Sequence, residues 1–224
     1  MVWLPDKYCA CVTMVQDSGM TAHIDHIVIG AASLAAGVTW VAERLGVLVP
    51  PGGTHFRMGT HNRLMQLGPR CFFEIIAPDP AAPAPGRPRW FGLDHPPAVP
   101  RLLTWLAAVP DLNAAMAACP IDTGLAEPME RGSLQWRLSV PADGALIEGG
   151  TMPGLIEWPD PHPAAGMADL GCTLTRLTLG HPRPDGLRAA LAAIGLSDPV
   201  IEIVQARGPT LSATIATPTG EHHL

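Results

Sequence analysis

Two glutamates and a histidine are the residues of this sequence best suited to chemistry. Glu74 lies in the apolar run CFFEIIA, whose alternation predicts a strand with Phe72, Glu74 and Ile76 on one face. A carboxylate among apolar side chains is costly unless it is paired or binds a metal. His26, in the apolar run HIDHIVIGA, is the matching candidate ligand or base. If Glu74 faces an apolar cavity, its pKa should rise and make it a candidate general base.

A second carboxylate has a similar setting. Glu157 follows Leu-Ile in the expected strand Pro153–Trp158, as Glu74 follows Phe-Phe in the earlier one. Each acid therefore has two interpretations. It is either a pocket acid that moves a proton on a bound carbonyl compound, or the ion-pair partner of an arginine such as Arg63 or Arg137.

Polar residues in a glycine-rich loop are candidates for contact with a substrate. The loop PPGGTHFRMGTHN carries His55, Thr60 and Asn62, although its glycines and asparagine also suit turn geometry. Arg176, in the apolar run LTRLTL, either binds a substrate carboxylate with its two-pronged donor or pairs with a glutamate on a neighbouring strand. Three tryptophans of expected strands either line a pocket or belong to the core: Trp105, Trp136 and Trp158.

The elements that must position these residues follow one order, a strand, a helix and then strands. In the first unit, residues 22–77, the strand His23–Ala31 precedes a helix that Ser33 caps and Gly46 ends. Alternation in that strand puts His26 on the face opposite Asp25. Two further strands, 62–67 and 71–77, are joined by a turn at Gly68-Pro69.

The order recurs twice more, and internal repetition is a strong fold signal. Residues 101–158 contain a strand to Val109, a helix that Asp111 caps, and strands at 133–140 and 153–158. Residues 170–217 form a shortened copy with a strand at 171–180, a helix from Pro184 to Gly195, and strands at 200–206 and 210–217 that read as a hairpin through Gly208-Pro209. We expect residues 1–21 to be a poorly ordered extension, with the true start at Met1 or Met20, and residues 219–224 to be a loose tail.

Composition excludes several classes of function. The formal net charge is −6 and no Lys or Arg run occurs, which argues against nucleic acid and anionic membranes as partners. Hydrophobic residues make up 47% of the chain and charged residues 15%, enough apolar material for a packed core. The five cysteines are scattered and odd in number, which favours reduced thiols in the cytoplasm over a disulfide framework.

Taken in order, these stretches resemble the vicinal oxygen chelate superfamily, and in particular its glyoxalase-like domain. The opening HIDHIVIGAASLAAGVTWVAERLG, the loop GGTHFRMGTHNRLMQLG, the strand FFEIIAP, GLIEWPDPHP and the closing ATPTG all fit, over roughly residues 22–218. The resemblance implies an α+β fold of repeated βαβββ modules that form a curled mixed sheet around a cavity. It also implies, in many relatives, one divalent metal in that cavity.

Carried over residue by residue, the resemblance implies a metal held by His26, Glu74 and Glu157. The fourth ligand should come from the first strand of the second unit, but counting back from Asp111 as from Ser33 reaches Thr104, a poor ligand for a divalent metal. Water or one of three histidines would then complete the shell: His55, His61 or His162.

Two functions follow as expectations. The first is a lyase or isomerase of a small oxygen-rich metabolite, with Glu74 and Glu157 as catalytic acids and His55, Thr60, Asn62 and Arg176 as substrate contacts. The second is a non-catalytic protein that sequesters a small aromatic or hydrophobic compound, as bleomycin-resistance relatives do; Thr104 and the tryptophans favour it. A degenerate domain serving only oligomerisation is a third interpretation. The superfamily habit also makes a homodimer an expectation.

Overall fold

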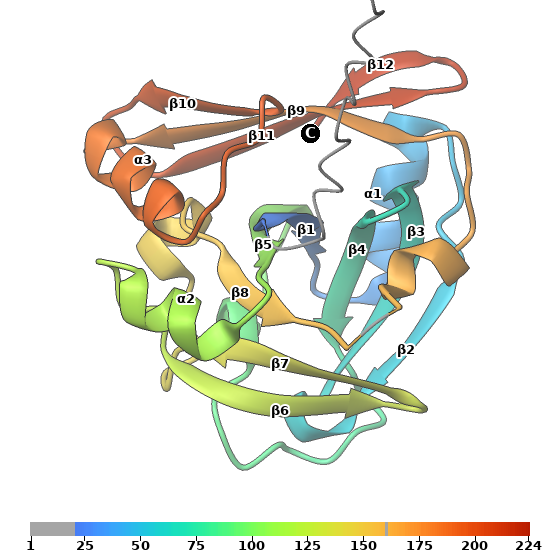
Figure 1. Cartoon of the computed structure of the whole chain (residues 1–224). Helices are drawn as coiled ribbons and strands as arrows, with labels where there is room; N and C mark the ends of the chain where they lie inside the picture. Colours follow the sequence, from blue (N-terminus) through green and yellow to red (C-terminus); the bar gives the residue numbers. More distant parts are fainter. Residues whose placement is uncertain (1–20, 160) are drawn as a thin grey trace, which may run out of the picture.

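The computed structural model describes residues 21–159 and 161–224, so the predicted extension lies outside the described residues except for Thr21. Within the described residues the strands form an eight-stranded sheet of order β2-β3-β4-β1-β5-β8-β7-β6 and a four-stranded sheet of order β10-β9-β11-β12. Figure 1 shows the large sheet curling around an interior, with the small sheet lying across its outer side. No helix of the described chain is long and apolar enough to cross a membrane.

The first module is built as local sequence signals predict. Strand β1 (His23–Gly30) leads to α1 (Leu34–Leu45), where Ser33 accepts a hydrogen bond from the Ala36 amide and Gly46 ends the helix in the left-handed conformation. Three strands complete the module: β2 (Pro51–His55), β3 (Thr60–Gly68) and β4 (Cys71–Pro78). A short 3-10 turn, η1 (Phe56–Met58), joins β2 to β3.

The second module repeats this order. Its strand β5 (Arg101–Ala108) precedes α2 (Leu112–Ala118), which Asp111 caps through the Ala114 amide. The remaining strands are β6 (Leu125–Arg131), β7 (Leu134–Val140) and β8 (Gly154–Glu157). In both modules the first strand pairs in parallel with the last, β1 with β4 and β5 with β8. The two modules therefore share one topology.

The two modules join through β1 and β5, which pair antiparallel. Val28 lies opposite Thr104, and His26 lies opposite Leu106. When the two antiparallel strands are exchanged, each pair maps onto the other. His26 in the first module is therefore equivalent in position to Thr104 in the second, and Val28 is equivalent to Leu106. At the other side of the curl β2 approaches β6, and no backbone ladder links these two strands among the described residues. Here the side chain of Arg131, on β6, donates a hydrogen bond to Asn62 on β3.

The third unit differs from the predicted shortened copy. It contains β9 (Thr173–His181), α3 (Pro184–Ala193), β10 (Ile201–Gln205), β11 (Thr210–Thr217) and β12 (Gly220–His223). The predicted loose tail is therefore a strand, paired with β11. The predicted hairpin of the two preceding strands is wrong, because β9 lies between β10 and β11.

Each face of the large sheet is covered by its own apolar cluster. Along β1, Ile27 and Ile29 join Leu177 and Leu179 of β9 in the larger cluster, which fills the space between the two sheets. Val28 instead belongs to a second cluster inside the curl, with residues of both modules. The small sheet thus closes the outer face of the large one and leaves the inner face for a pocket.

Candidate functional site

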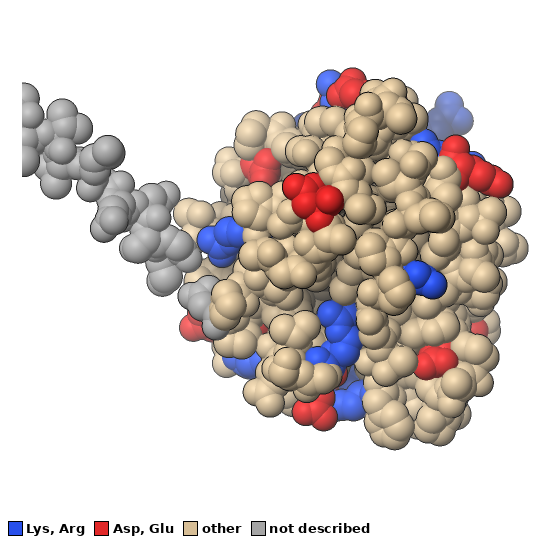
Figure 2. Space-filling view, turned by 90° about the vertical axis from the view of Figure 1, so that its right-hand side faces the viewer, with Lys and Arg blue, Asp and Glu red and all other residues tan. Residues whose placement is uncertain are grey.

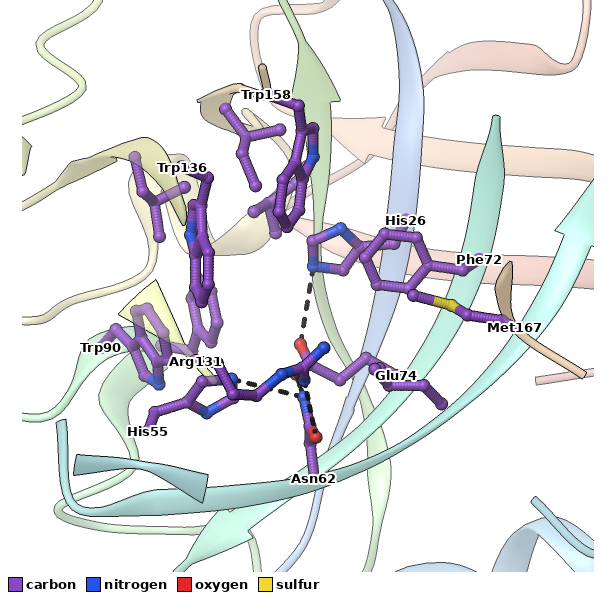
Figure 3. Close-up of a pocket in the computed structure, with 15 residues that line it drawn as sticks. His26, His55, Asn62, Phe72, Glu74, Trp90, Arg131, Trp136, Trp158 and Met167 are labelled. Atoms are coloured by element: carbon purple, nitrogen blue, oxygen red, sulfur yellow. Dashed lines mark hydrogen bonds and ion pairs between the residues drawn. The ribbon is translucent and has the colours of Figure 1, made fainter. Parts of the chain in front are cut away.

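A narrow pocket lies inside the curl, between the two modules (Figure 3). Its polar lining comes from the first module and from the end of β6: His26, His55, Asn62, Glu74 and Arg131. Its apolar lining is Leu64, Phe72, Trp90, Phe91, Leu106, Trp136, Leu138, Ile156, Trp158 and Met167. Of the predicted site residues, the structure brings His26, Glu74, His55 and Asn62 together here.

A bulge in β1 creates the most unusual feature of the pocket. Ile24 pairs with Ala107 and His26 with Leu106, so Asp25 is an extra residue without a partner on β5. The bulge breaks the strict alternation that the sequence predicted, and the Asp25 carboxylate forms a short hydrogen bond with Nδ1 of the adjacent His26. The ring of His26 stacks on Phe72 with centroids 4.2 Å apart, which fixes its orientation.

On its other side, His26 faces Glu74. Nε2 lies 3.5 Å from Oε2 of Glu74, and both side chains are buried. Burial alone would lower the pKa of His26, but the contacts with Asp25 and Glu74 outweigh it and raise the pKa to about 9. His26 is therefore an imidazolium held between two carboxylates.

Both carboxylates stay ionised. Burial would raise the pKa of Asp25, but hydrogen bonds from His162 and His26 hold it at about 2. Burial would likewise raise the pKa of Glu74, but His26 and the Asn62 amide lower it below its usual range. The raised pKa expected for Glu74 in an apolar cavity is therefore wrong, because Glu74 has polar neighbours.

Asp25 also ties the pocket to the segment that follows β8. Its Oδ2 accepts hydrogen bonds from Trp158 Nε1 and His162 Nε2, each at 2.8 Å. His162 Nδ1 accepts from the Ala164 amide, so its proton is on Nε2. Met167 of the same segment lines the pocket. Trp158 and Met167 thus line the pocket, while Trp158 and His162 contact Asp25, the residue that raises the pKa of His26.

Asn62 organises the floor of the pocket. Its Nδ2 donates to Glu74 Oε1 at 2.6 Å, and its Oδ1 accepts from the Gly53 amide and from Arg131 Nη1, at 2.9 and 3.1 Å. These bonds fix the orientation of the amide. Burial lowers the pKa of Arg131, an effect that the nearby Glu74 charge opposes.

His55 is a neutral neighbour of this floor. Its Nε2 lies 3.4 Å from Asn62 Nδ2, a donor, so its proton is on Nδ1, facing Thr60 Oγ1 at 3.1 Å. Burial lowers the pKa of His55 to about 4. Thr60 also accepts from Trp90 Nε1 and lies behind His55, outside the pocket lining. Its position fits the orientation of His55 better than the predicted contact with a substrate.

Glu157 lies apart from Glu74. Its Oε2 accepts from the Leu112 amide at 2.6 Å, at the start of α2, and lies 3.4 Å from Arg137 Nη1. Val28 and Leu106 occupy equivalent positions in the two modules. Val28 pairs with Glu74 and Leu106 pairs with Gly154, so the structural counterpart of Glu74 is Gly154. The predicted alignment of Glu157 with Glu74 is off by three residues, and its predicted catalytic and metal roles do not fit this location.

Arg176 also lies elsewhere. It is on β9 in the four-stranded sheet, more than half exposed, and its nearest carboxylate is Glu202 on β10 at 3.9 Å. Of its two interpretations, the pairing with a neighbouring strand matches this arrangement.

The pocket does not fit the divalent metal that superfamily members commonly bind. Among the described residues, His26 and Glu74 are the pair whose ligand atoms converge in the pocket, and these atoms face each other as an ion pair. The second module supplies Thr104 and Gly154 at the matching positions, and no cluster of three or more His, Cys, Asp or Glu residues occurs within 21–159 and 161–224. Two protein ligands are fewer than such sites use.

Sequence reasoning missed Asp25, Arg131 and Trp90 as members or supports of the site. Asp25 adjoins His26 in the sequence, but only the bulge turns it toward His26. Arg131 ends a strand that was not predicted, and Trp90 begins a short 3-10 turn, η2 (Trp90–Gly92), in the chain between β4 and β5. The sequence carried no local signal for the contacts of Arg131 and Trp90, which form only when the curl brings β6 and η2 to β3.

On the face in Figure 2, charged side chains are few among uncharged ones, and several basic side chains lie close together around the lower centre of the view.

Comparisons with known proteins agree with this architecture. The model of the glyoxalase-like domain family matches residues 24–195. A hypothetical protein from Staphylococcus aureus has a similar structure, with a TM-score of 0.61 at 12% identity over 85% of this chain and 88% of its own. No curated protein matches the sequence.

Two solved enzymes are more distant in structure. The methylmalonyl-CoA epimerase of Mycobacterium tuberculosis gives a TM-score of 0.41 at 22% identity, over 63% of this chain and 91% of its own. A mutant 4-hydroxymandelate synthase from Streptomyces coelicolor gives 0.41 at 12% identity, over 92% of this chain and 63% of its own. The family match, the paired βαβββ modules and the pocket between them lead to one conclusion: the chain belongs to the glyoxalase-like domain family.

Proposed function

We propose that this protein is an isomerase or lyase that moves a proton on a small carbonyl compound, using its own side chains as acid and base. The observation that carries the proposal is the buried series Asp25, His26 and Glu74, whose last two members line the pocket. Pairs of titratable groups with pKa values pushed apart are typical of acid–base sites.

Glu74 is the base in this proposal. It is ionised and lies in a pocket with mostly apolar walls, where a carboxylate can take a proton from a carbon next to a carbonyl group. The electron pair of the broken C–H bond moves onto the carbonyl oxygen. Return of the proton to another position gives an isomer, and departure of a neighbouring group gives a lyase product.

His26 is the acid. Its Nε2 proton faces the pocket and can donate to the carbonyl oxygen as negative charge develops there. Asp25 is a positioning residue, because it holds the imidazolium in charge and orientation without lining the pocket. His55 and Thr60 hold the Asn62 amide, which in turn orients Glu74.

Proton exchange in deuterated water tests this function without knowledge of the natural substrate. A panel of small aldehydes, ketones and oxo acids with an aromatic ring is incubated with the protein, and loss of the C–H signal is followed by NMR. We expect exchange with at least one compound, and its loss in Glu74→Gln. Exchange that persists in that variant, or no exchange with any compound, contradicts the proposal.

A second function keeps support from the apolar wall of the pocket. Trp136 and Trp158 lie with ring centroids 5.1 Å apart, and Trp90 and Phe72 extend the aromatic lining. A protein that only sequesters an aromatic compound would use such a wall. It would bind panel members as tightly after Glu74→Gln as before, and would catalyse no exchange.

A further inference from the structure

Arg131 is the one polar residue of the pocket to which the proposed proton transfer gives no task. It is the last residue of β6, and its side chain crosses to the first module and packs on Gly53 and Asn62. The approach is close, since a Cβ on Gly53 would lie 2.7 Å from Cδ of Arg131 and would force the arginine side chain to shift. Figure 3 shows the guanidinium beside Asn62 and Glu74.

The charge of Arg131 is poorly matched within the described residues. Its guanidinium makes one hydrogen bond, to Asn62 Oδ1, and no ion pair with a carboxylate of the described chain. Arg57 and Arg87, near the same strand, instead both pair with Glu127. A guanidinium has five N–H donors in a fixed fork, so most of the donors of Arg131 have no acceptor on the described protein.

A half-buried guanidinium on a pocket wall matches a planar anion. Two parallel N–H donors fit the two oxygens of a carboxylate, and such charge-assisted pairs are about twice as strong as neutral hydrogen bonds. Only the side-chain amide of Asn62 lies between Arg131 and Glu74, because Asn62 accepts a hydrogen bond from Arg131 and donates one to Glu74. An anion on Arg131 therefore lies on the same floor as the proposed base.

The rest of the lining restricts what the anion carries. Opposite the floor, the second module presents Trp136 and Trp158, and Leu106 and Leu138 of the same module also line the narrow pocket. Flat rings pack well against tryptophan faces. A ligand that satisfies both sides has a carboxylate at one end and a flat apolar ring at the other.

We propose that Arg131 binds the carboxylate of the substrate, and that the site acts on small ring-bearing carboxylic acids. The assignment of a substrate class rests on the proposed function, whereas the binding of a carboxylate by Arg131 does not. Arg131 is then a specificity-determining residue that holds the acid end while Glu74 and His26 act on the neighbouring carbonyl group.

Matched ligands test this binding by isothermal titration calorimetry on the full chain. Phenylacetate and phenylacetamide have nearly the same shape and differ in charge. We expect the wild-type protein to bind phenylacetate about tenfold or more tightly than the amide. Arg131→Gln should bind the two equally, and Arg131→Lys should keep part of the preference.

The control variant is Arg101→Gln, which removes an exposed arginine at the start of β5. It should keep the full preference, and circular dichroism should show all variants folded. Equal binding of acid and amide by the wild-type protein, or an undiminished preference in Arg131→Gln and Arg131→Lys, overturns the inference. An Arg131→Gln variant that does not fold leaves Arg131→Lys to decide.

The two proposals fail in different ways. If the wild-type protein prefers phenylacetate while no compound exchanges protons, the proton transfer is wrong and the carboxylate site stands. If exchange occurs and depends on Glu74, but acid and amide bind alike, the carboxylate site is wrong. Repeating the titration with Glu74→Gln separates binding from turnover, and the preference should persist in that variant.

Discussion

The two modules of the large sheet have the same topology, but the first lines the pocket with polar side chains and the second lines it mainly with apolar ones. Where the first module has His26 and Glu74, the matched positions of the second are Thr104 and Gly154. Ile76 pairs with Asn62, whereas its counterpart Ile156 pairs with Leu138. The first module thus forms a polar floor, and the second forms an apolar wall with Arg131 at its edge.

This asymmetry changes what the shared fold can do. A divalent metal site uses more than two protein ligands, and the second module presents Thr104 and Gly154 where the first presents His26 and Glu74. A polar floor facing an apolar wall instead suits a substrate with a reactive end and a ring. The difference lies in the side chains at matched positions, while the strand pairing is the same in both.

The largest expected effect separates the two acids. Glu74→Gln should lower proton exchange by about 10²–10⁴-fold, the range for loss of a general base. Glu157→Gln should leave exchange within about twofold, because Glu157 contacts the start of α2 and Arg137 outside the pocket. The rates of the two variants with the same panel compound provide the check, and equal losses would contradict the asymmetry.

The next effect concerns pH. Asp25→Asn removes the strongest of the contacts that raise the pKa of His26 to about 9, so that pKa should fall. The alkaline limb of the exchange rate should move to lower pH by about a unit or more, since His26 must keep its proton to act as the acid. NMR titration of the His26 Cε1–H signal measures the same change directly, and an unmoved titration would show that Asp25 does not set the charge of His26.

Stability follows the same linkage. The folded-state pKa of His26 is above the unfolded value of 6.5, so its contribution is fully present below pH 6.5 and disappears as pH rises through about 9. In wild-type protein, chemical unfolding should therefore become easier across that interval. Asp25→Asn should flatten this dependence, and a parallel pH profile for the two proteins would contradict it.

A gain of function would sharpen the comparison between modules. The double substitution Thr104→His and Gly154→Glu gives the second module the ligand types of the first. There is room for the Cβ at position 154, because its nearest neighbours would lie 3.6 Å or more away. The double variant should bind nickel or zinc more tightly than the wild-type protein, measured by calorimetry, at a cost of about 1–3 kcal/mol for the added side-chain volume. Equal affinity in both proteins would show that the matched positions are not what limits metal binding.

The smallest effect is expected far from the curl. Arg176→Gln removes an exposed ion pair on β9, which is worth about 0–1 kcal/mol. Exchange and phenylacetate binding should stay at wild-type values. A loss of binding would restore the substrate contact that the sequence suggested.

Local signals in the sequence predicted much of this fold. Ser33, Gly46 and Asp111 marked helix ends where the structure has them, because capping depends on neighbouring residues. Strands β2 and β6 escaped prediction, since PGGTH and LAEPMER contain glycine or proline and lie at the edges of the sheet. The small sheet was also mispaired, because the position of β9 between β10 and β11 is a long-range choice.

The site divides in the same way. His26, His55, Asn62 and Glu74 were found from polar residues in apolar or loop settings. Glu157 was wrongly matched with Glu74, because a similar short motif in two strands does not fix the strand register, and the register decides which residues occupy equivalent positions. Asp25 and Arg131 needed a bulge and a closed curl, which no local pattern specifies.

In the proposed function, the polar floor transfers protons without a resident metal. The most direct test is the exchange rate of protein dialysed against a chelator, measured alone and after addition of manganese, nickel or zinc. We expect the same rate in every sample and its loss in Glu74→Gln. Exchange that appears only with added metal, and disappears in His26→Ala, would contradict it.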